Sequence, residues 1–131
     1  MPQFKKVLLI DDDAITVIIC ERLMKISNFA AEVISCADGK MATEYLLLNI
    51  SCLPEIILLD LHMGVMNGWQ FLNWYEIWST SLKICPPIYV LSSSLSTEDV
   101  IRSESFTRVK GYIVKPITVG HLNDITANVP N

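Results

Sequence analysis

The sequence predicts an α/β protein in which helices cover both faces of one doubly wound parallel β-sheet. Two observations lead to this prediction. Five short β-prone segments alternate with five segments of helical character along the 131 residues, and such alternation is typical of parallel sheets built from βαβ units. Several of the β-prone segments are continuously apolar, as expected for strands that are buried on both faces.

The expected strands are short apolar runs that end at polar residues or turn signals. The first run ends in three consecutive aspartates, and the third follows Pro54 and ends at Asp60. The fourth follows two prolines and ends in three serines, and the fifth ends at Lys115. These patterns place strands at residues 7–11, 31–36, 55–60, 88–92 and 110–114.

Helical spacing and capping signals mark the five helices. Apolar residues recur at helical spacing in the first, with isoleucines at positions 15, 18, 19 and 26. Asp13 is suited to cap that helix, Asn67 and Gln70 predict a capping box, and Ser96 resembles another cap. The helices are expected at residues 14–27, from 38 onward, 67–80, from 96 onward and 119–128.

Composition excludes several classes of protein. Hydrophobic residues make up 51% of the chain and charged residues 18%, which excludes a disordered segment. The apolar runs fall far short of the roughly 20 residues that span a bilayer, so no membrane partner is expected. A net charge of −4 with scattered lysines and arginines argues against nucleic-acid binding.

Nothing in the sequence suggests a second domain or export from the cell. The chain has no linker-like stretch and no internal repeat, so residues 1–131 are expected to form one domain. The four cysteines form no CxxC pair, and the N-terminal apolar run is too short for a signal peptide. A cytoplasmic location is therefore expected.

The strand ends gather the residues that carry chemistry. A doubly wound sheet binds its ligands at the carboxyl ends of its strands, and those positions hold Asp11, Asp12, Asp60, Ser92 and Lys115. Crowded carboxylates repel each other unless a cation is bound or their pKa values rise, and oxygen-only ligands suit Mg²⁺. A lysine and a serine hydroxyl can contact phosphoryl oxygens. The set therefore predicts phosphoryl transfer to a carboxylate nucleophile.

Over essentially its whole length the sequence resembles the response regulator receiver domains of two-component signal transduction. The resemblance implies a flavodoxin-like, five-stranded sheet in the order 2-1-3-4-5 with five helices, as in the chemotaxis response regulator. It also implies a single receiver domain without an output domain, and a cis peptide bond before Pro116. The motifs are Leu8-Leu-Ile-Asp-Asp-Asp13, Ile57-Leu-Leu-Asp-Leu-His-Met63 with Asn67-Gly68, Val90-Leu-Ser92 and Gly111-Tyr-Ile-Val-Lys-Pro116.

The resemblance also implies the role of each acidic residue. Asp60 would accept a phosphoryl group from a phosphohistidine on a sensor histidine kinase or a histidine phosphotransfer domain. Asp11 and Asp12 would form the acidic pair of the metal site. Asp12, Asp60 and the backbone carbonyl of His62 would ligate Mg²⁺, and Lys115 would contact the phosphoryl group.

A conformational switch is the output that the resemblance implies. Ser92 would be the switch hydroxyl, and Tyr112 the aromatic side chain that turns inward when Ser92 moves. The family often has Thr at the switch position and Pro where this chain has Gly64. The surface that changes would run over residues 96–121 and would bind a downstream protein or, after phosphorylation, a second copy of the chain.

Three other functions compete with this interpretation. A phosphatase of the haloacid dehalogenase type would need a second acid two residues after Asp60, where this chain has His62. A receiver-like binding module that is never phosphorylated is disfavoured by the intact acidic set. An FMN site is disfavoured because three acids after the first strand repel phosphate. We therefore expect no enzyme with an external substrate, only self-phosphorylation and slow self-dephosphorylation.

Overall fold

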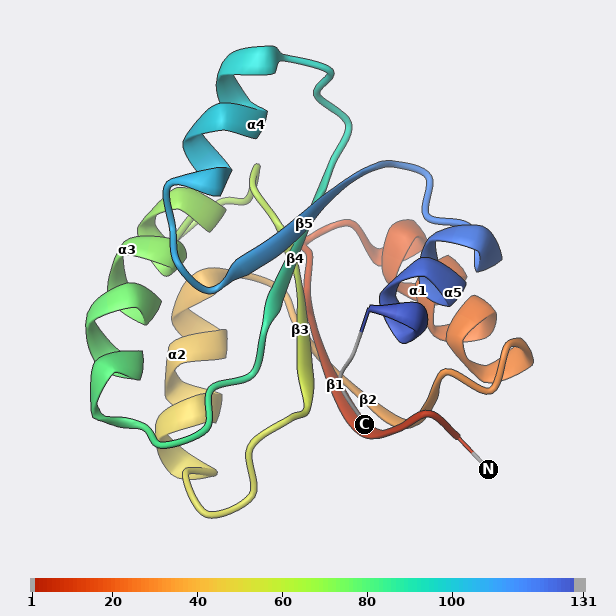
Figure 1. The fold of residues 1–131 in the computed structure, drawn as a ribbon, viewed down its shortest axis with the longest axis horizontal. Coiled ribbons are helices and arrows are strands. Elements are labelled where there is room, and N and C mark those ends of the chain that lie inside the picture. The colour runs from red at the N-terminus through yellow and green to blue at the C-terminus, as the bar shows by residue number, and fades with distance from the viewer. Residues whose placement is uncertain (1, 129–131) are drawn as a thin grey trace.

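The computed structural model describes residues 2–128 and shows one open parallel sheet with helices on both faces (Figure 1). The strand order is β2-β1-β3-β4-β5, so the predicted fold class is confirmed. The strands are β1 (Phe4–Ile10), β2 (Ala30–Cys36), β3 (Ile56–Asp60), β4 (Ile88–Ser92) and β5 (Val109–Val114). The helices are α1 (Ala14–Ile26), α2 (Gly39–Leu48), α3 (Gly68–Trp78), α4 (Thr97–Glu104) and α5 (Val119–Ala127), with a 3₁₀ turn at Ser79–Ser81.

The apolar core lies in two layers, one on each face of the sheet. Side chains of a strand point alternately to opposite faces, so Val7 and Leu9 enter one layer whereas Leu8 and Ile10 enter the other. The first layer is closed by α1 and α5, and the second by α2 and α3 (Figure 1). None of the helices in residues 2–128 has the length and apolar composition that a membrane crossing requires.

The central strands are the most completely buried part of the fold. Every residue of β3 and β4 is buried, which explains why their sequences are continuous apolar runs. The bounds of β4 agree with the sequence prediction. β1 begins at Phe4, three residues earlier than predicted, because Phe4 still pairs with Ala30 of β2 although the polar Lys5 and Lys6 follow it.

Helix α1 forms where the sequence predicted it, but its isoleucines do not face the core. Asp13 caps the helix, as expected, by accepting a hydrogen bond from the Ile15 amide. The buried residues of α1 are Cys20 and Met24. The isoleucine stripe, taken alone, suggests burial, yet its members are 46–79% exposed: Ile15, Ile18, Ile19 and Ile26. The stripe therefore leaves an apolar surface on this helix.

Helix α3 is fixed at both ends. Asn67 and Gln70 form the predicted capping box, in which each side chain accepts a hydrogen bond of 2.9 Å from the other residue's amide. Near the other end, the buried Tyr75 hydroxyl donates a 2.7 Å hydrogen bond to the Pro86 carbonyl, at the entry to β4. These contacts fix the start of α3, just after the loop that follows β3, and tie the helix to the segment before β4.

Each face of the sheet also contains one buried cysteine. Cys20 of α1 lies in the layer below α1 and α5, and Cys36 at the end of β2 lies in the other layer. Burial raises the pKa of each of these thiols to about 11. Cys52 is exposed and Cys85 is partly exposed, and all four cysteines are free thiols.

Candidate functional site

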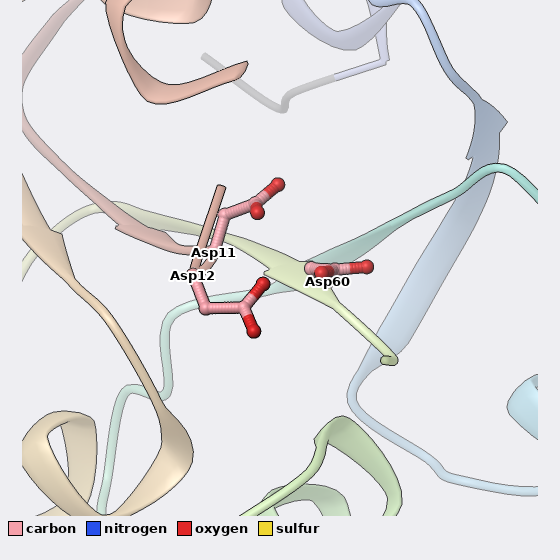
Figure 2. Close-up of side chains that lie close together, drawn as sticks. All are labelled: Asp11, Asp12 and Asp60. Atoms are coloured by element: carbon pink, nitrogen blue, oxygen red, sulfur yellow. The ribbon is translucent and has the colours of Figure 1, made fainter. Parts of the chain in front are cut away.

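Three carboxylates meet at the carboxyl edge of the sheet (Figure 2). Asp11 follows β1 and Asp60 ends β3; these strands are neighbours in a register that pairs Ile10 with Leu59. One carboxylate oxygen from each of Asp11, Asp12 and Asp60 lies within 4.8 Å of the other two. Asp11 and Asp60 are buried, whereas Asp12 is exposed. The acids predicted from the sequence therefore form one cluster that is open to solvent on the side of Asp12.

The three consecutive aspartates have different partners. Asp11 accepts a 2.9 Å hydrogen bond from the Asp13 amide, which folds the turn after β1. Asp13 points away to cap α1, and hydrogen bonds from the Thr16 hydroxyl and the Ile15 amide lower its pKa. Asp12 is left facing the cluster (Figure 2). Asp13 therefore has a structural role, and Asp11 and Asp12 belong to the site.

Lys115 is the cation of the site. Its ammonium lies 2.7 Å from Asp11 Oδ2 and 3.5 Å from Asp60 Oδ1. Its amide donates a 2.8 Å hydrogen bond to the Ser92 carbonyl, and the Lys115–Pro116 peptide bond is cis, as expected. Burial lowers the pKa of Lys115, but the hydrogen bond to Asp11 and the charges of both acids outweigh it and raise the pKa. The ammonium is therefore charged at neutral pH.

The surroundings of Asp60 disfavour the ionised form of its carboxyl group. Burial, and next the charge of Asp11, raise the pKa of Asp60, although Lys115 and a 3.3 Å hydrogen bond from the His62 amide oppose this shift. Lys115 thus pairs with two members of a cluster of three carboxylates. A second cation would relieve the remaining repulsion, and an oxygen-only donor set suits a hard ion such as Mg²⁺. Asp11, Asp12 and Asp60 fit that ion and are the residues that would hold it.

Ser92 and Tyr112 are joined through one residue that the sequence did not single out. Ser92 is fully buried at the end of β4, and its Oγ accepts a 3.0 Å hydrogen bond from the Ser94 amide. The Tyr112 hydroxyl donates a 3.0 Å hydrogen bond to the Ser94 carbonyl. Ser94 therefore links the two predicted switch residues. Its only signal in the sequence is its place in the serine run after β4.

His62 connects the loop after β3 to α4. Its imidazole is 59% exposed, and Nε2 lies 4.0 Å from Asp99 Oδ2 in the first turn of α4. The metal-binding role predicted for the His62 carbonyl stays a prediction. Gly64 has open space around it, so a side chain at this position would meet no neighbour.

The fold and the site together define a receiver-type α/β protein. Residues 7–127 match the family model described as the response regulator receiver domain, and the chain belongs to that family. This family serves two-component signalling, in which receiver domains interact with histidine kinases or phosphotransfer proteins and with downstream targets.

Solved structures agree with this membership. A two-component response regulator from Cytophaga hutchinsonii is 27% identical, with a TM-score of 0.86, over 96% of this chain and 98% of the other. A two-component response regulator from Legionella pneumophila is 26% identical, with a TM-score of 0.77, over 95% and 99%. The chemotaxis response regulator CheY4 of Vibrio cholerae, at 24% identity and a TM-score of 0.73 over 96% and 98%, shares the fold. A search of curated protein sequences finds no match.

Proposed function

We propose that this receiver domain accepts a phosphoryl group on Asp60 from the phosphohistidine of a histidine kinase or a histidine phosphotransfer domain, with Mg²⁺. The observation that carries the proposal is the position of the Asp60 carboxylate, 3.5 Å from the Lys115 ammonium and in a cluster with Asp11 and Asp12. This arrangement combines a carboxylate nucleophile with groups that hold positive charge where phosphoryl oxygens would lie.

Each residue of the site has a definite task in this reaction. A carboxylate oxygen of Asp60 attacks phosphorus while the bond from phosphorus to the donor's imidazole nitrogen breaks. Bound Mg²⁺ would supply positive charge to the phosphoryl oxygens. Lys115 contacts a phosphoryl oxygen while remaining close to Asp11, which holds the ammonium in place. The Ser92 hydroxyl accepts a hydrogen bond from Ser94 and still has its own proton to donate to a phosphoryl oxygen.

The proposed output is a change at the surface formed by α4, β5 and α5. When Ser92 turns toward the phosphoryl group, its bond to the Ser94 amide is lost, and the position of the Ser94 carbonyl that holds Tyr112 changes with it. A ligand shifts such an equilibrium only through its different affinity for the two states. Here the phosphoryl group supplies that difference, and a downstream protein or a second copy of the chain reads it.

The apolar surface of α1 supports contact with a phosphodonor protein beside the site. Ile15, Ile18 and Ile19 are exposed on the helix that begins next to the acidic cluster. A hollow of about 210 Å³ between α1 and the segment after β5 adjoins this surface, and Lys115 and Pro116 line it. Exposed apolar area of this kind is typical of protein contacts. The free thiols of the chain suit the cytoplasmic location that we propose for this encounter.

Intact-protein mass spectrometry after incubation with acetyl phosphate and Mg²⁺ tests the proposal. We expect one added phosphoryl group in the wild type, none without Mg²⁺ and none in Asp60→Asn. Asp124→Asn, which removes an exposed carboxylate on α5, is the matched control and should be modified like the wild type. Modification of Asp60→Asn, or no modification of the wild type by either acetyl phosphate or a phosphorylated histidine donor, would contradict the proposal.

A further inference from the structure

Helix α4 is held to the protein differently from the other helices. Ser103 is its only buried residue, whereas Ile101 on α4 and Leu95 just before it are 62% and 80% exposed. Its backbone lies mainly against β5, and its last turn lies near the first turn of α3 (Figure 1). Apolar burial therefore contributes little to its position, and particular side-chain contacts decide where it lies.

One of these contacts is between Arg102 and Trp69. The Arg102 guanidinium carbon lies 4.1 Å from the centroid of the Trp69 ring, within the range of a cation–π interaction. Trp69 is almost fully buried, and it also stacks on Phe106, just after α4, with ring centroids 6.4 Å apart. One tryptophan of α3 thus contacts the last turn of α4 and the residue that leads into β5.

The first turn of α3 carries Trp69 and is fixed against the Asp60 loop, the segment that joins Asp60 to α3. The Gly68 amide donates a 3.0 Å hydrogen bond to the Leu61 carbonyl. A Cβ at Gly68 would lie 2.5 Å from Leu61 Cα and 2.6 Å from the Asp60 carbonyl oxygen. Two backbone segments that lie this close cannot shift independently, so any displacement of the Asp60 loop also displaces Trp69.

We propose that Arg102 and Trp69 form a clasp that fastens α4 to α3, and that through this clasp the position of the Asp60 loop sets the position of α4. The clasp is a route from Asp60 to α4 that is separate from the one through Ser92, Ser94 and Tyr112. It is also separate from the contact between His62 and Asp99. Its regulatory meaning rests on the proposed phosphorylation of Asp60. The test below uses no phosphoryl transfer, so the two proposals succeed or fail separately.

Hydrogen exchange measured by mass spectrometry tests whether the clasp holds α4. In Arg102→Gln we expect amides of α4 to exchange roughly fivefold faster than in the wild type, the change that loss of a partly exposed cation–π contact produces in an opening equilibrium. Amides of β1 should be unaffected. Arg22→Gln, an exposed arginine on α1, is the matched control and should leave α4 unchanged. Unchanged exchange of α4 in Arg102→Gln would overturn the proposal.

A double-mutant cycle tests whether the clasp transmits the position of the Asp60 loop. Gly68→Ala forces the first turn of α3 away from Asp60 and should speed exchange in α4. In the Arg102→Gln background, Gly68→Ala should speed the exchange of α4 amides little further, because the contact between Arg102 and Trp69 is already lost. If Gly68→Ala speeds the exchange of α4 amides by the same factor in the wild type and in Arg102→Gln, the proposal is overturned. Asn67→Ala, which only removes the cap of α3, replaces Gly68→Ala in the cycle if that variant does not fold.

Discussion

Replacement of Asp60 by Asn should stabilise the metal-free protein, because the folded state confines three carboxylates around one lysine. At 4.8 Å or less, each of Asp11 and Asp12 repels Asp60 by about 3 kcal/mol or more at an effective dielectric constant of about 20. Lys115, at 3.5 Å, attracts Asp60 by about 5 kcal/mol on the same scale. The balance of roughly 2 kcal/mol disfavours ionised Asp60, and solvent screening at the exposed Asp12 reduces it to about 1 kcal/mol.

Urea unfolding in EDTA at pH 7 should therefore show a free energy of unfolding about 1 kcal/mol higher for Asp60→Asn than for the wild type, or a melting temperature about 3–4 °C higher. Saturating Mg²⁺ should reduce this difference, because the ion binds the folded wild type and relieves the same repulsion. Asp124→Asn removes one exposed carboxylate of α5 that lies outside the site, and it should leave stability nearly unchanged.

The stability difference between Asp60→Asn and the wild type should depend on pH in a definite direction. Burial and the charge of Asp11 raise the pKa of Asp60 in the folded protein, so the folded state binds this proton more tightly than the unfolded state. The destabilising contribution of ionised Asp60 is therefore fully present above its folded pKa and is lost as the pH falls through that value. The advantage of Asp60→Asn should disappear over the same range. An Asp60→Asn protein that is no more stable than the wild type in EDTA at pH 7 would refute the reasoning.

Three further predictions concern other single substitutions, the last with a matched control. Lys115→Gln leaves the fully buried Asp11 side chain without its cation, so the free energy of unfolding at pH 7 should fall by about 3 kcal/mol in urea and acetyl phosphate should no longer modify the protein. Tyr75→Phe removes a buried hydroxyl and leaves the Pro86 carbonyl unpaired, so a loss of about 1–2 kcal/mol is expected with phosphorylation unchanged. Ile18→Ser changes a 53% exposed side chain and should alter stability by less than about 0.5 kcal/mol. It should slow phosphorylation by a protein donor but not by acetyl phosphate, whereas Ile101→Ser on α4 should slow neither.

The sheet and the acidic cluster were predictable because their signals are local. A buried strand needs a short apolar run, and a polar residue that ends such a run must lie at the edge of the sheet. β4 has the bounds that the sequence predicted, and Asp11, Asp12 and Asp60 form one cluster as their positions at strand ends required. The preference of Lys115 for Asp11 over Asp60 was not predictable, because both acids lie at the same edge and only the geometry of the turn after β5 separates them.

Orientation and long-range contacts were beyond the reach of sequence patterns. The spacing of the isoleucines identified α1 as a helix, but which stripe of a helix meets the sheet depends on the surface available there. In α1 that stripe is the one with Cys20 and Met24. The contact between Arg102 and Trp69 joins two helices that are separated by a strand in the sequence, and neither residue has a local signal for it.

The two buried cysteines make each face of the sheet separately observable. At pH 8 a thiol with a pKa of about 11 is ionised in only about one molecule in a thousand, and a buried thiol is also shielded from reagents. Once Cys52 and Cys85 are blocked, Cys20 reacts only when the layer under α1 and α5 opens, and Cys36 only when the opposite layer opens. Simultaneous labelling of both cysteines as denaturant rises would identify the domain as one cooperative unit. Earlier labelling of one would identify the half of the protein that loosens first.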